Sequence, residues 1–154
     1  MSEFIQNDGG RSKYFKGNAG DCAVRALAIY SQKDYKQVYD SFNPYNVIGA
    51  SPRNGSDLNT LLDVYGVHGL ARIDIVSDEL SVEMLSDIDM IIEYDKHVHA
   101  CLKGVIHDTH EKNQPYEAVA IWVDKSIESA VSDRLSGEED ITAEPGAYGL
   151  TWVS

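Results

Sequence analysis

The sequence predicts an α+β protein in which helices from the first half of the chain pack on an antiparallel sheet from the second half. Apolar residues recur at helical spacing before Gly69, whereas short alternating or continuous apolar runs, typical of strands, begin at Leu70. Separate blocks of helices and strands are typical of α+β folds. The chain of 154 residues shows no repeat and no linker, so we expect a single domain over residues 1–154.

The first helix is predicted to begin at Cys22. Asp21 stands at the position of an N-cap, and apolar residues follow at Val24, Leu27 and Ala28. The residues before this helix, 1–17, contain an Asp-Gly-Gly turn and no periodic pattern, which predicts an irregular arm.

Two further helices are expected. The stretch DYKQVYDSFN begins at Asp34 and is ended by Pro44. The stretch SDLNTLLDVYG begins with Ser56 as its cap and stops at Gly66, since a glycine often follows the last turn of a helix.

The second half is predicted to consist mainly of strands. A short helix is expected at 82–88, and a tight turn at Lys103-Gly104 joins two of the strands. The predicted strands are 70–76, 89–94, 97–103, 105–109 and 118–124.

The C-terminal part has a different composition. SIESAVSDRL has the pattern of a helix, but residues 125–147 as a whole are acidic and expected to be partly flexible. Tyr148, Leu150 and Trp152 alternate, which predicts a C-terminal strand over 148–154 with one buried face.

The chain is strongly acidic. It carries 25 Asp and Glu against 13 Lys and Arg, a formal net charge of -12. This charge argues against nucleic acid and against an anionic membrane as partners, because both carry negative charge. No segment resembles a signal peptide or a membrane span, so we expect a cytoplasmic protein without a disulfide between Cys22 and Cys101.

The position of Cys22 predicts reactivity. A thiol in the first turn of a helix lies near unpaired backbone N–H groups and the positive end of the helix dipole. Both favour the thiolate, which is the nucleophilic form of cysteine. A small apolar side chain at the start of a helix would leave the same pattern, so position alone does not decide between the two interpretations.

The stretch HVHACLKGVIHDT supplies the groups that would make such a thiol catalytic. One strand begins at His97, and the strand after the turn carries Asp108. Across a hairpin the carboxylate can orient the imidazole, which can then serve the thiol as base and later as acid.

GDCAVRALA and HVHACLKGVIHDT together resemble motifs of the small papain-like cysteine peptidases of phages and bacteria, over roughly residues 16–109. The resemblance implies a papain-like fold with Cys22 as nucleophile, His97 as base and Asp108 as the orienting residue. The backbone N–H of Cys22 is expected to contribute to an oxyanion hole, and Asn18, the nearest side-chain amide before Cys22, is either a second donor or a turn residue. Lys16 stands where papain-like enzymes usually carry a glutamine.

Two other features of these motifs are open to interpretation. Arg25 is expected to form a structural ion pair rather than to bind substrate. His110 stands where relatives often have an aromatic residue.

A metal site is the competing interpretation of the second motif. His97, His99 and Cys101 alternate along one strand, and His107 and His110 follow its turn, all residue types that suit zinc. The spacings of common zinc sites are absent, so we expect no metal and no cofactor.

The function expected from these motifs is that of a cysteine hydrolase. It would cleave a peptide, isopeptide or amide bond in a protein or peptide substrate through a thioester. Two alternatives remain: a catalytically idle papain-like binding protein, such as a phage inhibitor of a host protein, and an acyl or amide transferase with the same triad.

Overall fold

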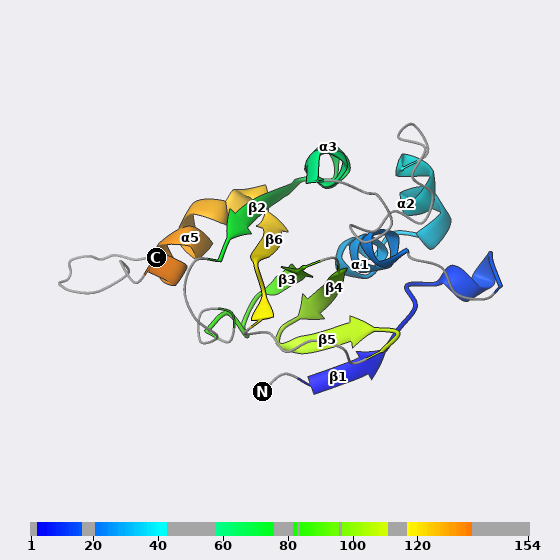
Figure 1. Ribbon diagram of the computed structural model, residues 1–154, viewed down its shortest axis with the longest axis horizontal. Coiled ribbons are helices and arrows are strands. Elements are labelled where there is room, and N and C mark those ends of the chain that lie inside the picture. The colour runs from blue at the N-terminus through cyan, green and yellow to red at the C-terminus, as the bar shows by residue number, and fades with distance from the viewer. Residues whose placement is uncertain are drawn as a thin grey trace.

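The computed structural model describes residues 3–16, 21–42, 58–75, 82, 84–95, 97–110 and 117–136. Within these residues the protein has four α-helices and one six-stranded sheet (Figure 1). The helices are α1 (Cys22–Ser31), α2 (Tyr35–Ser41), α3 (Leu58–Val67) and α5 (Glu128–Ser136), with the 3-10 turns η1 (Arg11–Lys13) and η5 (Lys125–Ile127). The strands are β1 (Glu3–Gln6), β2 (Leu70–Asp74), β3 (Asp89–Tyr94), β4 (His97–Leu102), β5 (Val105–Asp108) and β6 (Ala120–Asp124).

The sheet has the strand order β1-β5-β4-β3-β6-β2 and is mixed rather than antiparallel throughout. Four of its five pairings are antiparallel, but β1 runs parallel to β5, with Phe4 opposite Ile106. The prediction of an irregular arm over residues 1–17 is therefore wrong for residues 3–6. Phe4 packs against the core while Glu3, Ile5 and Gln6 are exposed, and one inward residue is too short a pattern to reveal a strand.

The turn between β4 and β5 sets the register of the site. Lys103 and Gly104 both adopt left-handed backbone angles, with φ of 51° and 84°, as a two-residue type I′ turn requires. Cys101 lies opposite Ile106, and Ala100 lies opposite His107. The same register, continued by one residue, brings β4 and β5 together at His99 and Asp108.

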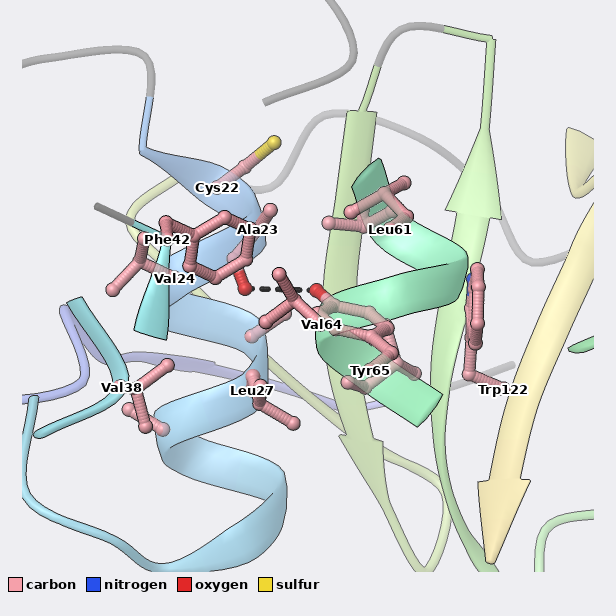
Figure 2. Close-up of a cluster of buried hydrophobic side chains, with 14 of the residues drawn as sticks. Cys22, Ala23, Val24, Leu27, Val38, Phe42, Leu61, Val64, Tyr65 and Trp122 are labelled. Atoms are coloured by element: carbon pink, nitrogen blue, oxygen red, sulfur yellow. Dashed lines mark hydrogen bonds between the residues drawn. The ribbon is translucent and has the colours of Figure 1, made fainter. Parts of the chain in front are cut away.

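Helices cover both faces of the sheet. On one face α1 packs against β4, with α2 and α3 beside it (Figures 1 and 2). This cluster contains Cys22, Ala23, Val24, Ala26, Leu27, Ala28, Tyr35, Val38, Phe42, Leu61, Val64, Tyr65, Leu70, Ile91, Val98 and Trp122. On the other face Val131 of α5 joins a second cluster with Val82, Leu85, Met90, Ile92, Tyr94, Cys101, Ile106, Ile121 and Val123.

The helices largely begin where the sequence predicts, but two terminal residues act differently. Asp34, which the sequence places at the start of this helix, caps α2 by accepting a hydrogen bond from the Lys36 backbone N–H. Asp21 occupies the N-cap position of α1, yet its side chain accepts no capping hydrogen bond. Gly66 does not end α3, which continues to Val67. The left-handed glycine that follows this helix is Gly69, with φ of 88°.

Other predicted elements are only partly covered. The stretch 84–87 forms turns with hydrogen bonds from Leu85 to Val82 and from Ile88 to Leu85. The helix predicted within 125–147 is present as η5 and α5. Asn18, Ser56 and the predicted strand 148–154 lie outside the described residues. Among the helices in the described ranges, none has both the length and the apolar character that a bilayer span requires.

Candidate active site

Cys22 is the first residue of α1, and its neighbours hold the start of this helix in place. The Tyr65 hydroxyl of α3 donates a 2.8 Å hydrogen bond to the Ala23 carbonyl oxygen. Figure 2 shows this bond and shows the Cys22 sulfur pointing away from Leu27 and the rest of the α1 core face. The Cys22 backbone N–H lies in the first turn of α1, where backbone N–H groups and the helix dipole suit a developing oxyanion.

His97 and Asp108 form a direct hydrogen bond. Nε2 of His97 lies 2.7 Å from Oδ2 of Asp108, and both side chains are buried. The two residues come from β4 and β5, which the turn at Lys103-Gly104 joins. A carboxylate can only accept, so Nε2 of His97 carries the hydrogen, and Nδ1 is the nitrogen available to another group.

His97 also interacts with Cys22. Burial alone would lower the pKa of His97, but the hydrogen bond to Asp108 and the interaction with Cys22 outweigh burial and raise the pKa above its ordinary value. Nδ1 of His97 is buried and makes no hydrogen bond among the described residues. Since Nε2 is bound to Asp108, Nδ1 is the nitrogen on the Cys22 side. The structure therefore brings together the three residues that the sequence singles out.

Asp108 is held as a carboxylate by several donors. Burial acts to raise its pKa, but hydrogen bonds from His97 and His99, the charge of His97 and the backbone N–H of Thr109 together hold the pKa far below its usual range. The Thr109 N–H lies 2.7 Å from Oδ1, and Nη2 of Arg25 lies 3.1 Å from the same oxygen. Asp108 is therefore negative whenever the protein is folded near neutral pH.

His99 occupies a different position from His97. Its Nδ1 lies 3.4 Å from Oδ2 of Asp108, and its Nε2 lies 2.9 Å from the Tyr94 hydroxyl. Burial lowers the pKa of His99, which favours the neutral ring. The neutral ring can then donate from Nδ1 toward Asp108 and accept the Tyr94 O–H at Nε2.

A chain of buried charges continues from Asp108 to the N-terminal segment. Arg25 forms ion pairs with Asp108 and with Asp21, confirming that it makes structural ion pairs. Asp21 also binds Nη1 of Arg11 at 3.3 Å and the Tyr35 hydroxyl at 2.5 Å. The spacing of Asp21 and Arg25, four residues apart at a helix start, is a signal in the sequence for this contact. Nothing in the sequence points to Arg11 or Tyr35.

The five residues that form the alternative zinc site in the sequence do not come together in the structure. Cys101 belongs to the core cluster on the α5 side, where burial raises its pKa to about 11. Nδ1 of His107 lies 3.1 Å from the Asn7 side-chain amide nitrogen, and His110 is exposed beside Thr109.

A different trio has the residue types and spacing of a metal site. His97, His99 and Asp108 offer ligand atoms within 4.8 Å of one another. However, His97 and Asp108 are at hydrogen-bond distance, and Asp108 also pairs with the cationic Arg25, which disfavours a dication at the same carboxylate. The geometry fits a hydrogen-bonded pair better than a metal centre.

Comparisons with protein-family models, with curated protein sequences and with solved structures found no significant match to this chain. The chemistry of the site therefore follows from its residues alone. A thiol beside an imidazole that is itself hydrogen-bonded to a carboxylate can form a nucleophilic thiolate, with the imidazole carrying the proton.

Proposed function

We propose that the protein is a cysteine hydrolase of papain-like fold that cleaves a peptide, isopeptide or amide bond. The observation that carries the proposal is the position of His97, which hydrogen-bonds to Asp108 through Nε2 and interacts electrostatically with Cys22. The arrangement of a nucleophile at a helix start and a histidine–carboxylate pair on the sheet supports the papain-like assignment, as do the sequence motifs.

The reaction would proceed through a thioester. The Cys22 thiolate attacks the carbonyl carbon, and the carbonyl electrons move to oxygen, near the backbone N–H of Cys22. His97 gives its Nδ1 proton to the leaving nitrogen as the carbon–nitrogen bond breaks. Water then attacks the thioester while His97 takes its proton, and the acid product leaves as the thiol is restored.

Asp108 would hold the imidazole in the orientation this cycle needs. Its hydrogen bond fixes the His97 tautomer with the hydrogen on Nε2, and its charge stabilises the imidazolium that forms during the reaction. Asn18 remains our candidate for a second oxyanion donor. We place the activity in the cytoplasm, the host cytoplasm if the protein is phage-encoded, on a protein or peptide substrate.

A catalytically idle binding protein is the second candidate, and one observation favours it. The Cys22 residue is only 3% exposed, so substrate would need a local opening to reach the sulfur. The net charge of -12 would suit a basic protein partner. A transferase would use the same triad with an acceptor other than water.

Reaction with an activated ester tests the proposal without knowledge of the substrate. With p-nitrophenyl acetate, we expect acetylation at Cys22, located by peptide mass spectrometry, followed by continued turnover. C22S should abolish both, whereas the control C101S should retain both. A single burst of nitrophenol without turnover would favour the idle binding protein, and no acetylation of Cys22 would refute the hydrolase.

A further inference from the structure

Arg25 bridges two carboxylates, those of Asp21 and of Asp108. We propose that Arg25 is a positioning residue that sets the charge balance of the Cys22–His97 pair and thereby the pH range in which the thiolate exists. This inference rests on the proposed function, because it concerns the nucleophile assigned there. It goes beyond it by assigning a role to a residue outside the triad.

The geometry places Arg25 at the centre of a continuous ion chain. Its Nη1 pairs with Asp21, and its Nη2 lies 3.1 Å from Asp108. Cys22 and Arg25 are three residues apart in α1, so their side chains lie on one side of the helix. The negative form of Cys22 stabilises the charged guanidinium, which is one cause of the raised pKa of Arg25. Because the interaction is mutual, the charged guanidinium also stabilises the negative form of Cys22.

A count of the charges in this ion chain shows what Arg25 contributes. Asp21 and Asp108 supply two negative charges, and Arg11 and Arg25 supply two positive charges, so these four groups balance. The site can then form a thiolate and an imidazolium without acquiring net charge. Such balance matters because an uncompensated charge is costly where solvent is excluded.

Other polar groups around the site do not disturb this count. Glu93 of β3 is paired with Arg72 through two hydrogen bonds, of 2.9 and 3.1 Å. Burial raises the pKa of each nearby tyrosine, so they stay neutral, and His99 is neutral for the same reason. Among the described residues, the ionisable groups that interact with the triad or with its direct partners include Arg11, Asp21, Arg25, Tyr35, Tyr65, Tyr94 and His99. Glu93, with its partner Arg72, acts on Tyr65, and the exposed Glu117 acts on Tyr94.

Two substitutions that each remove one charge should shift the pH at which the thiolate forms in opposite directions. Arg25→Gln leaves the chain with one excess negative charge, which disfavours a thiolate at Cys22. Asp21→Asn leaves one excess positive charge, which favours it. A purely structural role for the ion chain predicts the same direction of change for both, since both would loosen the start of α1.

The experiment measures the rate of iodoacetamide labelling at Cys22 as a function of pH, with mass spectrometry to separate Cys22 from Cys101. Relative to wild type, we expect the midpoint of the profile to rise by about one pH unit in R25Q and to fall by a similar amount in D21N. R25K should stay close to wild type because it keeps the charge. R134Q, which removes a charge on α5 far from α1 (Figure 1), is the matched control and should not shift.

The possible outcomes separate this inference from the proposed function. A wild-type midpoint like that of an ordinary thiol would refute the reactive nucleophile itself. A low wild-type midpoint with no shift, or with equal shifts in R25Q and D21N, would overturn the role of Arg25 and leave the hydrolase standing. If R25Q does not fold, D21N and R25K decide: a lowered midpoint in D21N with an unchanged one in R25K supports the inference, and any other result contradicts it.

Discussion

The Tyr94 hydroxyl and Nε2 of His99 lie 2.9 Å apart across the hairpin of β3 and β4. This contact binds His99 to its neighbours in the sheet, and its other nitrogen faces Asp108. His99 therefore has one ring nitrogen bonded to Tyr94 and the other facing Asp108, although it stands only two residues from His97 on the same strand.

The two histidines should consequently differ in their effect on the thiol. We expect H97Q to reduce iodoacetamide labelling of Cys22 at pH 7 by about a hundredfold, since the group that accepts the thiol proton is lost. H99Q keeps that group and should reduce labelling by less than about tenfold. Thermal melting of both variants checks that each is folded. If H99Q reduced Cys22 labelling more than H97Q, His99 rather than His97 would be the residue that accepts the thiol proton.

Asp108 should make the free energy of unfolding fall at acidic pH. Its pKa is lowered in the folded protein, so its contribution is complete above the unfolded pKa of about 3.9 and is lost progressively as the pH falls toward the folded pKa. D108N should lower the free energy of unfolding by about 3 kcal/mol at pH 7, because it removes a buried charge paired with Arg25 and His97.

Urea unfolding between pH 2 and pH 7 tests this expectation. The difference between wild type and D108N should narrow below about pH 4, where the unfolded wild-type chain takes up the proton. The histidines titrate nearer neutral pH, so they should not cause a narrowing of the stability difference below about pH 4. D87N, which removes an exposed partner of Arg134, serves as the control and should show a small, nearly constant difference. A constant large difference for D108N would contradict the assignment.

The two cysteines should react very differently although each residue is only 3% exposed. Cys101 lies among apolar side chains, and burial raises its pKa to about 11, so almost none of it is thiolate at pH 8. Cys22 has His97 beside it. We expect iodoacetamide to modify Cys22 alone in the folded protein at pH 8. In about 6 M guanidinium, which unfolds the protein, it should modify both residues. Modification of Cys101 first would show that access, rather than the histidine, decides.

Sequence reasoning reached the three central residues because each carries a local signal. Cys22 opens a helix after a polar loop, and His97 and Asp108 bracket a recognisable hairpin. The ion chain was harder to foresee: Arg25 and Asp108 are 83 residues apart in sequence, and their contact depends on how α1 crosses the sheet. The parallel strand at Glu3–Gln6 was missed for a similar reason, since it is defined by its partner β5 rather than by its own pattern.

The turn at Lys103-Gly104 offers a test of how the register of β4 and β5 supports the site. Both residues have positive φ, a conformation that asparagine adopts more readily than lysine and glycine more readily than alanine. K103N should therefore raise stability by about 0.5 kcal/mol. G104A should lower it by about 1–2 kcal/mol, because an added Cβ also approaches the Cβ of Ser86 to 3.3 Å. Urea unfolding measures both changes, and Cys22 labelling shows whether the register survives. We expect K103N and G104A to have opposite effects on stability and to leave Cys22 labelling unchanged. If G104A stabilised the protein, the turn would not be of type I′. The placement of Asp108 beside His97 would then have to be revised.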